Sequence, residues 1–305
     1  MTAELPQPID QFDIALDDGA AAVVRRHGNP DAPVRLFMSH GNGFAIDGYA
    51  AFWAPLGERF DLIAFDFRNH GRNAPSDPAN HHYGQFARDL ATIHGAVTGL
   101  LGAKRNVGVF HSMSGRTAMK DAVETGWRWD ALVLFDPPNF PPPGHPLYDK
   151  AKGFEMLLAN WAAARRDRFA DPAELAAEYA RTRAHRSWVE GAHLAMARAV
   201  LRRDAAAGDW ALVCPRELES DVYRQNIPLN LWPPASAYGG PVALIASDPG
   251  LEGAMVPALA NHELGTRHGY DYTSIPGTGH LLQIQKPAEC RAAMTAFLER
   301  CGLPV

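Results

Sequence analysis

Short apolar runs recur along the first 135 residues and alternate with stretches of helical spacing. Four such runs lie at 34–38, 62–65, 107–110 and 131–135. A short, nearly continuous apolar run is typical of a strand buried on both faces of a parallel sheet. Between the runs, residues 83–101 place apolar side chains at helical spacing. Strands that alternate with helices predict an α/β sheet with right-handed crossovers.

The ends of the chain fit the same pattern. Residues 11–16 and 20–26 flank Asp17-Asp18-Gly19, a turn signal, and are predicted to form a β-hairpin. The strand pattern resumes at 242–246 and 270–275, and a last helix is expected over 287–301, with Pro287 at its start.

The middle of the chain has a different pattern. Residues 137–146 (PPNFPPPGHP) are too rich in proline for a helix or a central strand. From about 150 to 232 the spacing is helical, Ala, Arg and Trp are frequent, and no clear strand is visible. We therefore predict one α/β domain, formed by 1–136 and 236–305, that is interrupted by a helical insertion at 137–235.

Composition excludes several classes of protein. The 305 residues are 47% hydrophobic and 21% charged, which rules out a disordered or collagen-like chain. A net charge of -5 argues against a nucleic-acid partner, and no apolar stretch is long enough for a membrane helix. The N-terminal sequence MTAELPQPID lacks the features of a signal peptide, so we expect a cytoplasmic protein. The three cysteines show no metal-ligand spacing, and no metal site is expected.

Ser112 stands where a strand is expected to turn sharply into a helix. It follows the apolar run 107–110 and precedes Gly115 and the helical stretch 116–125. A serine on such a turn exposes its hydroxyl, and the next N–H lies free at the helix start, as in a nucleophile elbow. Phe110 departs from the usual Gly-x-Ser-x-Gly pattern, because small residues normally flank the strained serine. An ordinary serine-rich turn therefore stays open as the alternative.

Two further glycine-rich turns follow predicted strands. His40-Gly41-Asn42-Gly43-Phe44 follows the run 34–38, where its N–H groups would lie at the carboxyl edge of the sheet. Such donors can stabilise a developing oxyanion. His280, in Pro276-Gly277-Thr278-Gly279-His280, follows the last strand and could reach back over the sheet as a general base.

These motifs, in this order, resemble the α/β-hydrolase family. Asp66-Phe67-Arg68-Asn69-His70-Gly71-Arg72 is similar to the family's Asp-x-Arg-Gly-His-Gly segment, with Asn69 in place of glycine. The resemblance implies a mostly parallel eight-stranded sheet flanked by helices, with a helical cap after the sixth strand. It also implies that Ser112 is the nucleophile, that His280 is the base, and that the Met113 N–H and the Asn42 region form the oxyanion hole.

The acid of the triad has two candidates. Most family members place it after the seventh strand, where Asp248 in Ser247-Asp248-Pro249-Gly250 arrives about two residues early. A minority place it after the sixth strand, where Asp136 ends the run 131–135. The sequence favours Asp136, with Asp248 as the alternative; either would orient the imidazole.

A serine at the elbow argues against haloalkane dehalogenases and epoxide hydrolases of this fold, which use aspartate there. Serine with histidine favours a cofactor-free hydrolase that cleaves an ester, thioester, lactone or amide of a small or medium acyl substrate. A carboxylic-ester hydrolase is the leading expectation. The alternatives are C–C bond hydrolysis, haloperoxidase-like chemistry on the same triad, and a ligand-binding protein with little turnover. The ligand-binding alternative rests on Phe110, which departs from the elbow pattern.

The substrate-contacting residues are expected at the oxyanion turn, the elbow and the cap. The candidates are Gly43, Phe44, His111, Trp161 and Trp188. The cap tryptophans could equally form the cap's own core. Nine arginines between 150 and 210 could attract a carboxylate or could be a solvated helix face. The sequence gives no indication of the oligomeric state.

Overall fold

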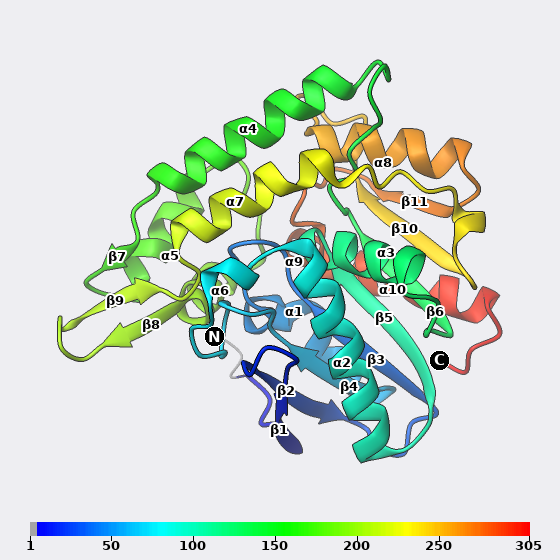
Figure 1. The fold of residues 1–305 in the computed structure, drawn as a ribbon, viewed down its shortest axis with the longest axis horizontal. Coiled ribbons are helices and arrows are strands. Elements are labelled where there is room, and N and C mark those ends of the chain that lie inside the picture. Colours follow the sequence, from blue (N-terminus) through cyan, green and yellow to red (C-terminus); the bar gives the residue numbers. More distant parts are fainter. Residues whose placement is uncertain (1–4) are drawn as a thin grey trace.

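The computed structural model describes residues 5–305, and one eight-stranded sheet is its central element (Figure 1). The strand order is β1-β2-β4-β3-β5-β6-β10-β11. The strands from β4 to β11 pair in parallel, whereas β1 and β2 form an antiparallel hairpin whose second strand joins β4. This confirms the predicted fold class. The strands are β1 (Asp10–Ala15), β2 (Ala21–Gly28), β3 (Val34–Ser39), β4 (Asp61–Phe65), β5 (Arg105–His111), β6 (Ala131–Phe135), β10 (Val242–Ser247) and β11 (Asp271–Ile275).

Helices cover both faces of this sheet, which explains why its strands read as continuous apolar runs. All six residues of β3 are buried. Leu36 and Met38 face one helical layer, and Phe37 faces the other, because successive side chains of a strand point to opposite faces. The first layer contains α1 (Ala50–Trp53), α9 (Leu282–Gln285) and α10 (Pro287–Arg300), and the second contains α2 (Tyr83–Leu101), α3 (Met113–Glu124) and α8 (Val256–Arg267).

The insertion between β6 and β10 forms a cap over one end of the sheet domain. Its helices α4 and α7 run side by side along the top of Figure 1. The cap is not purely helical as predicted, since it also contains a three-stranded antiparallel sheet in the order β7-β9-β8. The cap elements are α4 (Tyr148–Ala164), β7 (Arg168–Phe169), α5 (Pro172–Arg181), α6 (Ala192–Val200), β8 (Leu201–Asp204), β9 (Asp209–Leu212) and α7 (Arg216–Asn226).

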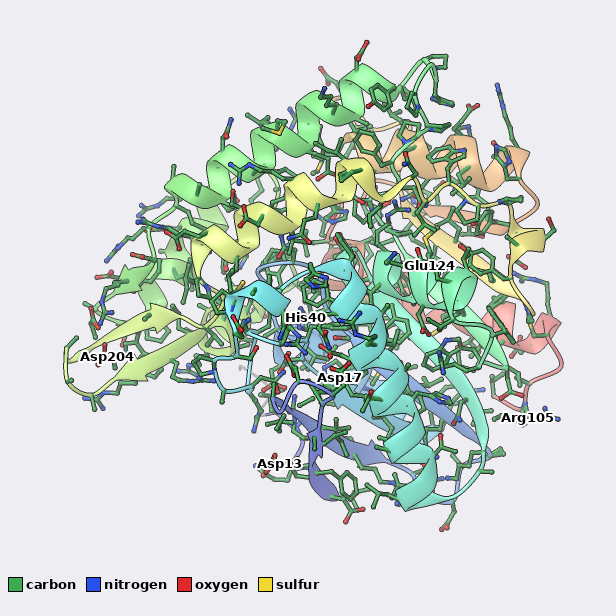
Figure 2. All side chains as sticks on the ribbon, in the orientation of Figure 1. Asp13, Asp17, His40, Arg105, Glu124 and Asp204 are labelled. Carbon is green, nitrogen blue, oxygen red and sulfur yellow. The ribbon has the colours of Figure 1, made fainter. Side chains whose placement is uncertain are left out.

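The cap and the sheet domain share one apolar core. Phe169, Tyr179 and Met196 of the cap belong to the same buried cluster as Leu36 and Trp53 of the sheet domain. Side chains fill the space that the ribbons leave between the two parts (Figure 2). The cap therefore lies closed on the carboxyl ends of the central strands. Among the described residues, no helix combines the length and the apolar character that a membrane span requires.

Candidate active site

Ser112 lies at the junction of β5 and α3 in a backbone conformation that few residues adopt. Its φ is 53° and its ψ is -117°, in a region where a side chain strains the backbone. Its N–H donates to the carbonyl of Phe135 at 2.9 Å, which anchors the turn to β6. This strained turn holds the serine outside the sheet at the start of α3, as the elbow motif predicts.

Phe110 fits this elbow because Gly108 makes room for its ring. The Phe110 side chain is fully buried and makes edge contacts with Phe65 and Trp129 on the α2–α3 side of the sheet. A Cβ on Gly108 would lie 2.5 Å from that ring and 2.5 Å from Leu132. The bulk that the family pattern avoids is thus directed into the core, away from the Ser112 hydroxyl.

Ser112, His280 and Asp136 form one chain of hydrogen bonds. The Nε2 of His280 lies 2.9 Å from the Ser112 Oγ, and its Nδ1 lies 2.8 Å from the Asp136 Oδ2. Asp136 is fully buried, while the His280 side chain is 16% exposed. Burial alone would raise the pKa of Asp136, but the hydrogen bond and charge of His280, with the Ser247 N–H, hold it below its usual value. A buried carboxylate beside Nδ1 leaves Nε2 facing the hydroxyl, the arrangement a general base needs.

Asp248, the alternative acid, contacts the histidine loop rather than the imidazole. Its Oδ2 accepts from the Gly277 N–H at 2.7 Å, and its Oδ1 accepts from the Gly250 N–H at 2.8 Å. Its own N–H donates to the carbonyl of Thr278 at 3.0 Å. Asp248 therefore fixes the backbone that carries His280, and Asp136 is the carboxylate that the structure brings to Nδ1.

The turn after β3 lies against the elbow, as the oxyanion interpretation requires. A Cβ on Gly41 would lie 3.1 Å from the Ser112 Cβ and 3.0 Å from the His111 Nδ1, so glycine allows this close approach without a shift of its neighbours. Within residues 5–305, no acceptor engages the N–H of Asn42 or of Met113. Both donors are therefore available to a developing oxyanion. The Gly43 N–H is not, because it donates to His70 Nε2 at 3.2 Å.

His111 and Tyr49 form a polar support behind the triad. The ring of His111 lies 2.9 Å from the carbonyl of His280 through Nε2 and 2.8 Å from the Tyr49 hydroxyl through Nδ1. That hydroxyl also accepts from the Gly41 N–H at 3.3 Å. His111 is completely buried, and its predicted contact with a substrate stays a prediction. Its ring links the oxyanion turn to the histidine loop; sequence alone gave no sign of Tyr49.

The cap presents an aromatic cluster to the oxyanion turn. Phe44 packs against Tyr179, His185 and Trp188, with ring centroids 6.1 to 6.4 Å apart. Trp188 is 5% exposed, so most of its surface packs within the cap. Trp161 on α4, in contrast, is 47% exposed, and the Arg165 guanidinium lies over its ring, 5.2 Å from the ring centroid. The predicted place of Trp161 in the substrate pocket stays a prediction.

Arg165 and Glu219 form a buried ion pair at the inner side of the cap. The Arg165 Nη1 lies 2.8 Å from the Glu219 Oε2, and their side chains are 9% and 3% exposed. A Cβ on Gly43 would lie 2.6 Å from the Glu219 carboxyl group, so the pair adjoins the oxyanion turn. Of the nine cap arginines counted in the sequence, the other eight are exposed. The arginine cluster is therefore mainly a solvated face, and Arg165 is the exception.

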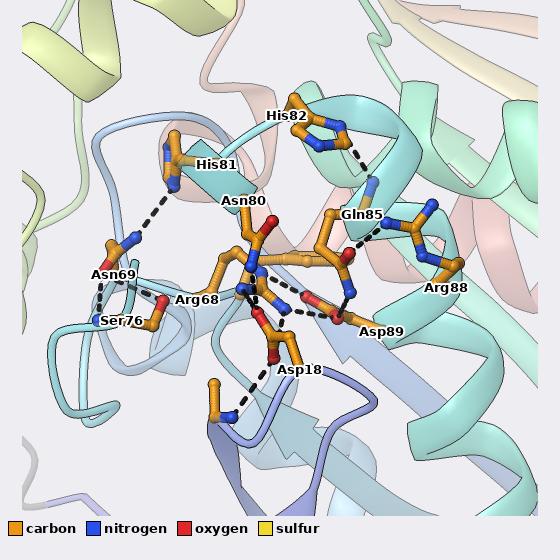
Figure 3. A network of polar contacts seen from close by, with 12 residues as sticks. Asp18, Arg68, Asn69, Ser76, Asn80, His81, His82, Gln85, Arg88 and Asp89 are labelled. Atoms are coloured by element: carbon orange, nitrogen blue, oxygen red, sulfur yellow. Dashed lines mark hydrogen bonds and ion pairs between the residues drawn. The ribbon is translucent and has the colours of Figure 1, made fainter. Parts of the chain in front are cut away.

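A network of polar and charged side chains joins the segment after β4 to the β1–β2 turn and to α2 (Figure 3). Arg68 donates to both carboxylate oxygens of Asp89 at 2.7 Å and to Asp18 at 2.7 Å. Asn69 has a φ of 58°, a conformation that asparagine tolerates better than most residues, which explains why it can replace the family's glycine. His70, the next residue, accepts from the Gly43 N–H through Nε2 and so links this segment to the oxyanion turn.

His70, His81 and Cys214 come together nearby, with potential ligand atoms within 4.8 Å of one another among the described residues. Their hydrogen bonds do not suit a metal ion. The two nitrogens of His70 already pair with the Arg68 carbonyl and the Gly43 N–H. His81 Nδ1 faces the Asn69 amide NH₂, so the ring proton belongs on Nε2 and blocks that lone pair.

A parallel sheet with a strained serine after β5, a histidine after the last strand and a cap after β6 defines the α/β-hydrolase class of protein. The chain belongs to the alpha/beta hydrolase family, whose sequence model matches residues 36–293. A comparison with curated protein sequences gave no significant match.

Solved structures with the same fold align over nearly the whole chain. E-2-(acetamidomethylene)succinate hydrolase is 18% identical, with a TM-score of 0.77, over 95% of this chain and 99% of that one. A thioesterase domain from the curacin biosynthetic pathway is 17% identical, with a TM-score of 0.68, over 93% and 98%. A thermophilic esterase from Thermogutta terrifontis is 18% identical, with a TM-score of 0.64, over 96% and 99%. At such identities, these similarities establish the fold.

Proposed function

We propose that the protein is a cofactor-free serine hydrolase that cleaves a carbonyl substrate through an acyl-enzyme. The observation that carries this proposal is the unbroken chain from the Ser112 Oγ through His280 to Asp136. The free N–H groups of Asn42 and Met113 beside the serine add the oxyanion site that acyl transfer needs. Ser112 is the nucleophile, His280 the general base and Asp136 the acid.

The proposed reaction proceeds in two acyl-transfer steps. The Ser112 Oγ attacks the carbonyl carbon and passes its proton to His280 Nε2, while the negative charge on the carbonyl oxygen is held by the two N–H groups. The imidazolium, stabilised by Asp136, gives the proton to the leaving group as the carbonyl–leaving-group bond breaks. A water then repeats the attack on the acyl-enzyme with His280 as base, which releases the acid and restores Ser112.

An ester is the leading substrate class, with thioesters, lactones and amides as the other members of the proposal. Proteins of this fold that are named esterase, thioesterase and E-2-(acetamidomethylene)succinate hydrolase support acyl substrates in general. Phe110, the feature that favoured a non-catalytic ligand-binding protein, points into the core, so that alternative loses its support. The geometry of the site offers no support for C–C bond hydrolysis or for haloperoxidase chemistry. A small-molecule substrate and a cytoplasmic location, without a nucleic-acid or membrane partner, stay part of the proposal.

Covalent labelling tests this proposal without knowledge of the substrate. A fluorophosphonate probe should phosphonylate the purified protein, and peptide mapping should find the label on Ser112. The Ser112→Ala variant, with the same fold by circular dichroism, should take no label. Hydrolysis of matched p-nitrophenyl ester, thioester, lactone and anilide substrates would then rank the classes. Equal ester hydrolysis by wild type and Ser112→Ala would refute the mechanism.

A further inference from the structure

The carboxylate of Asp136 is held by four donors. Its Oδ2 pairs with His280 and accepts from the Ser247 Oγ at 2.9 Å. Its Oδ1 accepts from the Ser247 N–H at 3.0 Å and from the Asn261 Nδ2 at 2.9 Å. The Asp136 φ is 41°, so its backbone departs from the usual strand conformation where β6 ends.

Asn261 continues into a line of buried amides. Its Oδ1 accepts from the Asn139 Nδ2 at 2.8 Å, and the Asn139 Oδ1 accepts from the Arg116 Nη1 at 2.8 Å. A carboxylate at one end can only accept hydrogen bonds, and a guanidinium at the other end can only donate them. The direction of both amides is therefore determined by Asp136 and Arg116, which gives Asn261 one orientation.

Arg116 is an unusual member of a protein core. It is fully buried on α3, four residues after Ser112, and among the described residues no carboxylate forms an ion pair with it. A buried charge without a paired counter-charge is costly, so a side chain of this kind needs strong polar partners. Its Nε donates to the Asn226 Oδ1 at 3.1 Å, and its Nη1 also donates to the Leu231 carbonyl at 2.7 Å.

Three of these partners come from the insertion. Asn139 lies at its start, Asn226 at the end of α7 and Leu231 just before the chain returns to β10. Asn226 also donates to the buried Glu155 of α4 at 2.8 Å. The guanidinium thus joins α3, which follows the serine, to the cap and, through two amides, to α8 and the triad.

We propose that Arg116 is a positioning residue for the triad: acting through Asn139 and Asn261, it aligns the Asp136 carboxylate with His280 when the cap is seated. The inference rests on the proposed function. It adds that the cap, besides covering the site, completes the arrangement that makes Ser112 reactive. Arg116 itself touches neither the substrate nor the reacting atoms.

The Asn139→Asp variant tests this relay with little change of shape. An aspartate there still accepts from the Arg116 Nη1, so that hydrogen bond is kept, but it cannot donate to Asn261. The Asn261 amide is then free to turn its oxygen toward Asp136, and the carboxylate shifts. For the fluorophosphonate probe, we expect the maximal labelling rate of Ser112 to fall by about 10- to 100-fold, while the probe concentration at half-maximal rate stays unchanged.

Asn106→Asp is the matched control, because Asn106 is a buried amide on β5 that pairs with His94, away from the relay. It should label at the wild-type rate. Asn226→Leu tests the relay from the cap side and should also slow labelling. The double variant Asn139→Asp/Asn226→Leu should be no slower than the slower single variant, because residues in one network are not additive.

The outcomes separate this inference from the proposed function. A wild-type protein that takes no label at Ser112 would refute the proposed function itself. If the wild type is labelled and a folded Asn139→Asp protein is labelled equally fast, the relay is refuted and the serine hydrolase stands. Additive slowing in the double variant would also refute it, since it would reveal two unrelated local effects. Should Asn139→Asp not fold, Asn226→Leu alone decides by the same criterion.

Discussion

Four buried histidines at the carboxyl edge of the sheet should make the fold sensitive to mild acid. His40, His70, His81 and His111 are each at most 2% exposed. Burial lowers the pKa of His40 to about 4, of His70 and His111 to about 3, and of His81 to about 2. In the unfolded chain, each imidazole regains a pKa of about 6.5. Between these values the unfolded state binds more protons, so stability falls as the pH falls below about 6.5.

The size of this effect follows from proton linkage. From pH 7.5 to pH 5, a histidine that stays neutral in the folded state but is protonated in the unfolded state costs about 2 kcal/mol of stability. The four together cost about 8 kcal/mol. Glu155 opposes them, because burial raises its pKa to about 7 and the folded state takes up a proton there first. The Glu155 carboxyl group therefore adds about 2 kcal/mol to the free energy of unfolding over the same pH range. The net loss of about 6 kcal/mol is similar to the whole stability of many proteins.

Other buried groups act in both directions without changing this sign. Burial lowers the pKa of His27, His94 and His185 to about 4, which adds to the loss. Burial also raises the pKa of the carboxyl groups of Asp66 and Glu219, which reduces the loss. We therefore expect a net loss of several kcal/mol by pH 5.

Urea unfolding at pH 7.5, 6.5, 5.5 and 5.0, followed by tryptophan fluorescence, measures this loss directly. The free energy of unfolding should fall most steeply between pH 6.5 and 5. In the Glu155→Gln variant the loss from pH 7.5 to 5 should be about 2 kcal/mol larger, because the opposing group is gone. A free energy of unfolding that is equal at pH 7.5 and 5.0 would show that these imidazoles are not kept neutral by the fold, and the reasoning would fail.

Three further predictions test other parts of the structure. Asp136→Ala should slow turnover by about 10⁴-fold, because it removes the carboxylate at His280 Nδ1. Asp248→Ala only loosens the Gly277 backbone and should slow turnover by about 10-fold or less. Similar losses in kcat for the two variants would contradict the assignment of the acid. Gly108→Ala should lower the free energy of unfolding in urea by about 1 to 3 kcal/mol, because its Cβ would meet the Phe110 ring. In a Phe110→Ala background the same substitution should lower it by less, and an undiminished loss would exclude this contact as the cause. Arg165→Met should lower the free energy of unfolding by about 3 kcal/mol, because it leaves the Glu219 carboxylate buried and unpaired. Adding Glu219→Leu should restore most of that stability. If it restores none, the pair matters for packing alone.

The sheet was predictable because its strands are buried on both faces. Every strand from β3 to β6 reads as an apolar run, and the helix predicted at 83–101 matches α2 residue for residue. The positions of Ser112 and His280 followed from strand order alone, since parallel strands bring their carboxyl ends to one edge. Asp136 was preferred because some members of the family that the sequence resembles place the acid after the sixth strand, where Asp136 stands.

The cap was less readable from its sequence. Its strands are two to four residues long, and β8 contains Arg202, Arg203 and Asp204, so no apolar alternation marks them. They pair only with one another, and the pairing of β7 with β9 joins residues about forty positions apart. The direction of a single side chain, outward for Trp161 and fully inward for His111, is likewise set by packing that a local pattern does not encode.

The relay from Arg116 to Asp136 shows why supporting residues escape sequence reasoning. Asn139 and Asn261 are separated by 122 positions and belong to no motif. Each would pass for an ordinary polar residue of a loop or helix. Their role is visible only when the hydrogen-bond partners at both ends determine which way each amide points.

The order in which the strands are added to the sheet has a consequence for synthesis of the chain. β6 is made before residues 136–241, yet the strand that covers its edge, β10, follows them. At roughly 5 to 20 residues per second, a ribosome needs about 5 to 20 s to make some hundred residues. During that time Leu132–Phe135 presents an unpaired, wholly apolar edge that can pair with another chain. We therefore expect the nascent protein to depend most on chaperones while its cap is being translated.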